Sequence, residues 1–311
     1  MSTVVLSGGV GAARFLSGLV QAMDEGEITV ISNTGDDGIF FGLYVSPDID
    51  TVLYTLAGLV NPKTGWGVAN DTFATLGELQ ALGNSAWFNL GDRDFATHIY
   101  RTMLLRQGET LSTATARLAE ARGLRCTVLP MSDDRVETQF ETNEGLLPFQ
   151  EYMVKHHCQV DVSGIRFVGA DTARPAPGVV EAIRLAERII IAPSNPLISI
   201  GTILAVKEIR AAMQEAKDRV VAISPIVGGS AIKGPAAKLM QGLGYEASAA
   251  GVAKIYRPFA EYMVIDRQDE VLLPEIEALG MRVIATDTIM ASSQRKKALA
   301  QAALDLFPQT H

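Results

Sequence analysis

Short runs of β-branched apolar residues alternate with helical patterns over most of this chain, and this alternation constrains the fold more than any other feature. It is typical of parallel strands joined by crossover helices. Two runs, Arg188–Ala192 and Arg219–Ile223, are apolar on both faces, as strands covered by helices on both sides must be. The expected strands are Thr3–Ser7, Ile28–Asn33, Cys126–Leu129, Arg188–Ala192, Arg219–Ser224, Glu261–Ile265 and Arg282–Ala285.

The middle of the chain differs, because the pattern from Asp48 to Gly123 is mostly helical and a hairpin-like stretch follows at Val136–Glu141. The sequence therefore predicts an α/β fold with one domain over residues 1–311. Its core is a Rossmann-like, doubly wound, mostly parallel sheet, and residues 40–175 form a mainly helical insertion or cap. The expected helices are Asp71–Leu82, Asp94–Arg106, Leu111–Arg122, Val179–Ala186, Ile203–Glu215, Ala236–Leu243, Leu272–Leu279 and Gln294–Leu306.

Composition narrows the classes of partner. Lys and Arg number 27 against 35 Asp and Glu, a net charge of −8, and the longest basic cluster is only Arg295–Lys297. A nucleic-acid partner is therefore not expected. No apolar run approaches the ~20 residues of a membrane helix, and no basic-then-apolar leader precedes the first strand. With two cysteines in no paired motif, we expect a cytoplasmic protein without a membrane partner.

The loop after the first strand carries Gly8, Gly9 and Gly11 ahead of a helix, and ligands of α/β sheets bind at the carboxyl ends of strands. Such a loop either cradles a phosphate or serves tight strand–helix packing. The loop does not match either of the two commonest phosphate-binding motifs. The dinucleotide fingerprint lacks its third glycine, replaced by Arg14, and its ribose-binding acid, replaced by Asn33. The Walker A pattern is absent throughout, so NAD-dependent and standard ATPase functions are both disfavoured.

Acidic residues follow the second strand and open the next helices. Asp36 and Asp37 lie in a polar loop that is either a solvated turn or functional. Asp48 has the position of a helix N-cap, whereas Asp50 lies further inside the helix. Asp71 opens another predicted helix. Two carboxylates from separate segments that meet near a diphosphate would bind Mg²⁺, although each alone is more simply a cap.

Other strand-end loops carry polar groups suited to an anionic ligand. Arg93 stands between two acids, where it either forms a surface ion pair or reaches a phosphate or hydroxyl. Of the four histidines, His98 is expected at the surface or in the core. The remaining candidates for phosphate or nucleotide binding are Ser194 and Asn195 after the fourth strand, and Gly228, Gly229, Ser230 and Lys233 after the fifth.

Taken in order along the chain, these motifs resemble the 2-phospho-L-lactate transferase family. The resemblance covers essentially the whole sequence, and the ordered set is specific although each motif alone is weak. One departure is Ala12, where many relatives carry another glycine. The motifs are Ser7–Gly11 with Arg14-Phe15, Asn33–Asp37, Pro47–Asp50 with Tyr54–Leu56, Gly65–Gly67, Asn89–Asp94, Pro193–Pro196 and Ser224–Gly229.

The resemblance implies a step in the synthesis of the deazaflavin coenzyme F-420. Enzymes of this family transfer a phosphoacid group from a guanosine diphosphate ester to the precursor Fo (7,8-didemethyl-8-hydroxy-5-deazariboflavin), release GMP and use Mg²⁺. It implies Fo binding at Asp50 and Arg93, metal binding at Asp50 and Asp71, a catalytic role for Asp50 and a homodimer. Binding the metal and accepting the hydroxyl proton are competing roles for Asp50.

Two questions stay open at this level. The donor acid is lactyl, enolpyruvyl or glyceryl, since these groups differ by a few atoms. The alternative function is a non-catalytic, nucleotide-sugar-binding regulator of the gluconeogenesis-factor type, which shares the fold and an Asp-Asp-Gly loop. The segments Pro47–Asp50 and Asn89–Asp94 favour the transferase.

Overall fold

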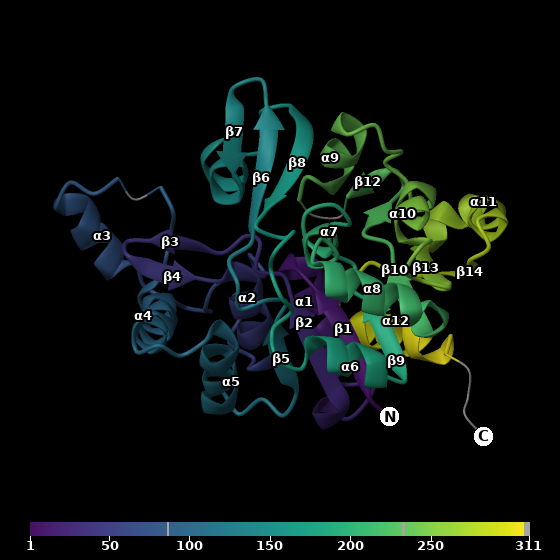
Figure 1. Ribbon diagram of the computed structural model, residues 1–311, viewed down its shortest axis with the longest axis horizontal. Coiled ribbons are helices and arrows are strands. Elements are labelled where there is room, and N and C mark those ends of the chain that lie inside the picture. The colour runs from purple at the N-terminus through teal and green to yellow at the C-terminus, as the bar shows by residue number, and fades with distance from the viewer. Residues whose placement is uncertain (86, 232–233, 308–311) are drawn as a thin grey trace.

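The computed structural model describes residues 1–85, 87–231 and 234–307, and a seven-stranded parallel sheet forms its centre (Figure 1). The order is β14-β13-β10-β9-β1-β2-β5. From β1 the chain adds β2 and β5 on one side, and it then adds β9, β10, β13 and β14 on the other side. Every predicted strand is confirmed to within one residue at each end. The bounds are β1 Thr3–Ser7, β2 Ile28–Ser32, β5 Thr127–Pro130, β9 Arg188–Ile191, β10 Val220–Ile223, β13 Tyr262–Asp266 and β14 Arg282–Thr286.

Helices cover both faces of the sheet, as the two-sided apolar strands require. In β1, Val4 and Leu6 join one buried cluster and Val5 joins the other, because successive side chains of a strand point to opposite faces. The face of Val5 packs against α1 (Gly9–Leu19), α2 (Pro47–Leu56), α5 (Leu111–Ala121) and α12 (Ser293–Asp305). The opposite face packs against α6 (Val179–Leu185), α7 (Ile200–Ile203), α8 (Lys207–Glu215), α9 (Ala236–Gly242), α10 (Ala249–Tyr256) and α11 (Leu273–Ala278).

Residues 40–175 are more mixed than the mainly helical cap that the sequence predicts. They contain α2, α3 (Ala74–Ala81), α4 (Asp92–Arg106) and α5, but also β5 of the central sheet. A separate antiparallel sheet consists of β6 (Glu137–Thr142), β7 (Gly145–Pro148) and β8 (Val162–Val168). It lies beside the central sheet, near the carboxyl ends of the central strands (Figure 1). Phe140 of β6 packs on Tyr152 at 4.2 Å between ring centroids, which gives this small sheet its own core.

Two short hairpins lie outside these sheets. One joins β3 (Gly38–Phe40) to β4 (Leu43–Val45), and the other joins β11 (Ile226–Val227) to β12 (Ser230–Ala231). Within residues 1–85, 87–231 and 234–307, no helix combines the length and apolar character needed to cross a bilayer.

The first and last helices of the domain pack together at a glycine. A Cβ placed on Gly18 of α1 would lie 2.3 Å from the backbone oxygen of Lys296 in α12, so only glycine fits this contact. Because the obstacle is backbone, it cannot move aside as the end of a flexible side chain would.

Gly18→Ala should therefore lower the free energy of unfolding by about 1–3 kcal/mol, since the added methyl group forces α1 and α12 apart. Gly77 of α3 is the matched control, because a Cβ there meets nothing within 4 Å. Gly77→Ala should leave stability unchanged or raise it by about 0.5–1 kcal/mol through helix propensity. Urea unfolding followed by circular dichroism measures both, and a Gly18→Ala protein as stable as wild type would contradict the packing account.

Candidate active site

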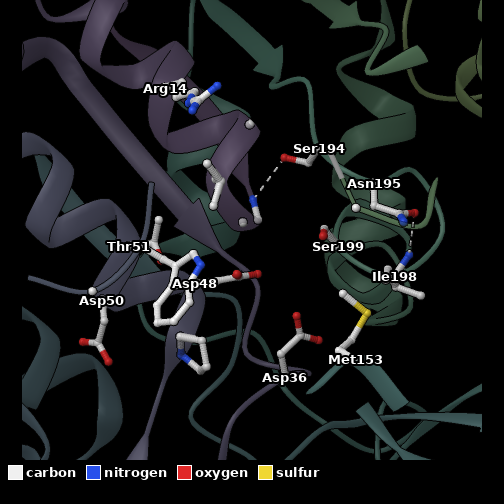
Figure 2. Close-up of a pocket in the computed structure, with 18 of the residues that line it drawn as sticks. Arg14, Asp36, Asp48, Asp50, Thr51, Met153, Ser194, Asn195, Ile198 and Ser199 are labelled. Atoms are coloured by element: carbon white, nitrogen blue, oxygen red, sulfur yellow. Dashed lines mark hydrogen bonds between the residues drawn. The ribbon is translucent and has the colours of Figure 1, made fainter. Parts of the chain in front are cut away.

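A cavity of about 660 Å³ opens at the carboxyl ends of the central strands (Figure 2). It lies over the crevice between β1 and β9, where the strand order reverses, the usual ligand site of doubly wound sheets. Its walls come from the loops after β1, β2, β9, β10 and β14, together with α2 and α4. Widely separated parts of the chain thus meet in one site.

The glycine loop lines this cavity, and part of its hydrogen-bonding capacity is already used inside the protein. The Gly8 amide donates to Ser194 Oγ at 3.2 Å, and the Gly9 amide donates to the Asp48 carboxylate. A Cβ on Gly11 would lie 2.1 Å from the backbone oxygen of Pro193. Both interpretations of the loop therefore have support: it packs tightly against the loop after β9 and also faces the ligand space.

Asp36 and Asp48 place two carboxylates in the cavity wall at the end of β2 and the start of α2 (Figure 2). Burial, followed by the charge of Asp48, raises the pKa of Asp36 well above its usual range. Burial also raises the pKa of Asp48 to about 6, although Asn33 Nδ2 donates to its Oδ2 at 2.9 Å. Asp36 Oδ1 is buried without a hydrogen-bond partner among the described residues. Burial therefore disfavours the charged form of both carboxylates, and no cationic side chain of the described residues pairs with them.

Asp37, its neighbour in the same loop, has a different role. Both of its oxygens accept a hydrogen bond from Ser46 Oγ at 2.8 Å, and Tyr44 OH donates to it at 3.0 Å. Asp37 therefore fixes the β3–β4 hairpin and the start of α2. Of the two adjacent acids that the sequence left undecided, only Asp36 lines the main cavity in the part of the chain that the structure describes.

Asp50 lines the cavity, and a buried arginine holds it. Arg101 of α4 is fully buried and donates to both carboxylate oxygens, with Nη1 at 3.0 Å from Oδ2. His98 Nδ1 lies 3.6 Å from the same Oδ2. A bidentate arginine fixes a carboxylate in one orientation, so Asp50 presents a rigid acceptor edge.

Three residues at this end of the cavity were not identified as site residues from the sequence. Asp94, predicted as a helix cap, accepts from Tyr54 OH at 2.6 Å and lies 3.1 Å from His98 Nε2. Tyr54, Asp94 and His98 all line the cavity. The signal was present, because Asp94, His98 and Arg101 recur at helical spacing and so share one face of α4.

Asp71 and Arg93 lie at the N-terminus of α4. The Asp71 carboxylate accepts from the amides of Arg93 at 2.8 Å and Asp94 at 3.1 Å, which caps the helix. The Arg93 side chain is exposed and donates from Nη1 to Ala69 O at 3.0 Å. Neither residue belongs to the cavity lining within the described residues.

Ser194 and Asn195, predicted to bind phosphate or nucleotide, lie in the cavity wall after β9. Asn195 Oδ1 accepts from the amides of Leu197 at 2.9 Å and Ile198 at 3.3 Å. Its Nδ2 is buried and has no hydrogen-bond partner in the described chain. A buried donor without a partner costs free energy unless a ligand satisfies it, so Asn195 offers a donor to a bound molecule.

The predicted cradle after β10 is a hairpin turn. Gly228 and Gly229 have φ of 56° and 74° between β11 and β12, and Gly228 donates its amide to Asp269 at 3.1 Å. Gly228, Gly229 and Ser230 are exposed, whereas Gly234 and Pro235 of the same loop line the cavity. Lys233 lies outside the described residues.

Apolar side chains form much of the rest of the cavity wall. Trp66, Phe88, Phe149 and Met153 contribute rings and a thioether that suit a planar aromatic ligand. Within the described residues no group of three or more His, Cys, Asp or Glu is arranged to hold a metal ion by itself. A divalent ion here would need oxygen ligands from a substrate, as Mg²⁺ bound with phosphates has.

Asp50→Asn removes the charge opposite Arg101 and should lower the free energy of unfolding by about 3–5 kcal/mol, because the guanidinium stays buried without a counter-ion. Asp134→Asn is the control, since Asp134 pairs with an exposed arginine at the surface. Thermal unfolding measures both, and an Asp50→Asn protein as stable as wild type would contradict the described pair.

Comparison with known proteins identifies the family of this chain. Residues 3–304 match the model of the family described as 2-phospho-L-lactate transferase CofD. The chain is 47% identical to a phosphoenolpyruvate transferase of Streptomyces griseus, in a match that covers 98% of both chains. It is 40% identical to a 2-phospho-L-lactate transferase of Methanosarcina mazei, over 98% of this chain and 100% of the relative.

A solved structure supports the fold independently of close sequence similarity. A member of the UPF0052 family from Bacillus halodurans superposes with a TM-score of 0.67 at 17% identity, over 97% of this chain and 98% of that chain. At this identity the likeness concerns the fold alone. The family match and the relatives extend over nearly the whole chain, and the predicted Rossmann-like fold is confirmed. The chain belongs to the 2-phospho-L-lactate transferase family of transferases.

Proposed function

We propose that this protein transfers a phosphoacid group from a guanosine diphosphate ester to Fo, releases GMP and forms a coenzyme F-420-0-type product. Its relatives are named for transfer of phosphoenolpyruvate or 2-phospho-L-lactate. The observation that carries the proposal is the buried pair Asp36 and Asp48, which faces the crevice without a cationic partner among the described residues. Carboxylates without a cationic partner suit a reaction on a diphosphate that uses bound Mg²⁺.

Asp36 and Asp48 fit Mg²⁺ better than the predicted pair Asp50 and Asp71. The charge of Asp50 is already offset by its bidentate pair with Arg101, and Asp71 lies outside the cavity lining of the described residues with both oxygens accepting from α4 amides. Asp36 keeps a free buried oxygen, and two neighbouring carboxylates of raised pKa favour a bound cation. A Mg²⁺ ion held by Asp36 and Asp48 would supply positive charge beside the diphosphate as the bond to GMP breaks.

The acceptor would lie at the Asp50 end of the cavity. Asp50, fixed by Arg101, accepts a hydrogen bond from the terminal ribityl hydroxyl of Fo and takes its proton as the oxygen attacks phosphorus. The rings of Trp66 and Phe88 offer a surface for the tricyclic ring of Fo. Arg93 lies on the same helix as Asp94 and His98 but outside this lining, so its contact with Fo stays a prediction.

The donor acid is proposed by resemblance to the relatives. The Streptomyces griseus phosphoenolpyruvate transferase is 47% identical, and the Methanosarcina mazei 2-phospho-L-lactate transferase is 40% identical. An enolpyruvyl donor is therefore the first to test, followed by the lactyl and glyceryl donors.

A homodimer is the proposed assembly, and an apolar face at one end of the molecule supports it. Helices α3 and α4 lie side by side there (Figure 1). Ile99, Tyr100 and Met103 are exposed on the outer face of α4, and Phe73 is exposed beside α3. Exposed apolar patches of this kind mark association sites. The inner face of α4 carries Asp94, His98 and Arg101. Association through its outer face would therefore also restrict movement of these active-site side chains.

Replacing Ile99 and Met103 together by serine should convert a dimer into a monomer, because it removes apolar area from the centre of the face. Size-exclusion chromatography with light scattering measures the mass. Val271→Ser, at another exposed apolar position, is the control and should leave the dimer intact. A monomeric wild type, or a dimer that survives the double change, would refute this surface.

Incubation with Fo, Mg²⁺ and each guanosyl donor should release GMP and give an F-420-0-type product detectable by mass spectrometry. Asp36→Asn should reduce turnover by at least about 100-fold, since the diphosphate loses its metal. Asp171→Asn, at an exposed aspartate, should leave turnover unchanged. No product with any donor would contradict the proposed function, and binding of a UDP-sugar without Fo turnover would favour the regulator alternative.

A further inference from the structure

The charges of the main cavity are strongly one-sided. Four aspartates line it, Asp36, Asp48, Asp50 and Asp94, whereas Arg14 is the one lysine or arginine in its lining among the described residues. A donor with a diphosphate and a carboxylate brings several negative charges into this space. Because cationic side chains are scarce in this lining, the position of Arg14 determines where an anionic group of the donor can bind.

Arg14 lies on the second turn of α1, well separated from Asp36 and Asp50 in the view of Figure 2. It is half-buried, and its side chain has no hydrogen-bond or ion-pair partner in residues 1–85, 87–231 and 234–307. The cavity thus has a carboxylate end and a cationic end, with the glycine loop and Ser194 between them.

A second cation, Lys296, lies outside the cavity lining given by the described residues but close enough to Arg14 for the two charges to interact. Gly18, one turn after Arg14 on the same helix, touches the backbone of Lys296, so α12 brings Lys296 against this side of α1. Lys296 is also half-buried and lacks a partner among the described side chains. Burial and the charge of Arg14 lower the pKa of Lys296. Its neighbour Arg295, by contrast, pairs with Asp287 at 3.3 Å.

We propose that Arg14 and Lys296 form an anion subsite that takes the phosphate of the leaving nucleotide, an inference that rests on the proposed transferase function. Two adjacent half-buried cations repel each other, and an anion between them removes that repulsion. A guanidinium also matches phosphate oxygens with two parallel hydrogen bonds. Ala291, just before the N-terminus of the 13-residue helix α12, also lines the cavity, so the positive end of this helix dipole lies on the same side.

The subsite has a defined part in the transfer. The acceptor hydroxyl oxygen bonds to the phosphorus that bears the acid, and the bond from that phosphorus to the oxygen of the GMP phosphate breaks. The electron pair of the broken bond stays on the GMP oxygen, while the hydroxyl proton goes to Asp50. Negative charge therefore grows on GMP as it leaves, and cations at Arg14 and Lys296 stabilise this charge more in the transition state than in the substrate.

Binding of pyrophosphate, GMP and guanosine to wild type, Arg14→Gln and Lys296→Gln tests the subsite by isothermal titration calorimetry. Arg14→Gln should weaken GMP and pyrophosphate about tenfold or more, the size of a charged hydrogen bond, and leave guanosine unchanged. Lys296→Gln should weaken the same two ligands by a smaller factor. Arg295→Gln is the matched control on α12 and should change none of the three affinities.

The outcomes separate this inference from the proposed function. If Arg14→Gln binds GMP and pyrophosphate as wild type does, or if wild type binds neither, the subsite is refuted whatever the reaction is. If affinity falls only for the complete donor and not for GMP, the anion is the carboxylate of the acid, and the assignment to the leaving phosphate is wrong. A tenfold loss for pyrophosphate in a protein without transferase activity would uphold the anion subsite and refute the reaction.

Discussion

Two buried carboxylates without a cation beside them, Asp36 and Asp48, are the constraint on which the rest of the site depends. Burial raises the pKa of both, so the protein without a bound ion holds them at a cost in free energy. The neighbouring groups reduce this cost only in part, because Asn33 and the Gly9 amide donate to Asp48 while one oxygen of Asp36 has no partner among the described residues. The glycine loop is therefore as much a support for Asp48 as a cradle for a ligand.

The remaining acids are satisfied within the protein, which gives each a separate task. Arg101 fixes Asp50, two amides hold Asp71 at a helix start, and Ser46 and Tyr44 hold Asp37 in a hairpin. Fixed carboxylates orient substrates well but have less capacity left for a metal. Under the proposed function, the cavity would divide into a metal region at Asp36 and Asp48, an acceptor region at Asp50 and a cationic region at Arg14.

The sheet was predictable from sequence because its strands are apolar on both faces, as strands of a parallel sheet between two layers of helices are. The position of the site followed from the topology, and Asp50, Ser194 and Asn195 do line the cavity. The partner of each acid was not predictable, since the buried Arg101 lies 51 residues from Asp50. The sequence also predicted that Gly228 and Gly229 bind a phosphate. Their loop leads to the cavity, but the turn that contains them faces solvent. Of the β6–β8 sheet, the sequence indicated only the hairpin-like stretch Val136–Glu141. The strand Val162–Val168 was missed because it is half-exposed and weakly patterned.

The claim that Asp36 and Asp48 hold the divalent ion is tested most directly by electron paramagnetic resonance of Mn²⁺ added in place of Mg²⁺, with GMP present. Titration should show bound Mn²⁺ in wild type and in Asp71→Asn, and only free Mn²⁺ in Asp36→Asn and Asp48→Asn. Bound Mn²⁺ in Asp36→Asn together with its loss in Asp71→Asn would contradict the account and return the metal to the neighbourhood of α4.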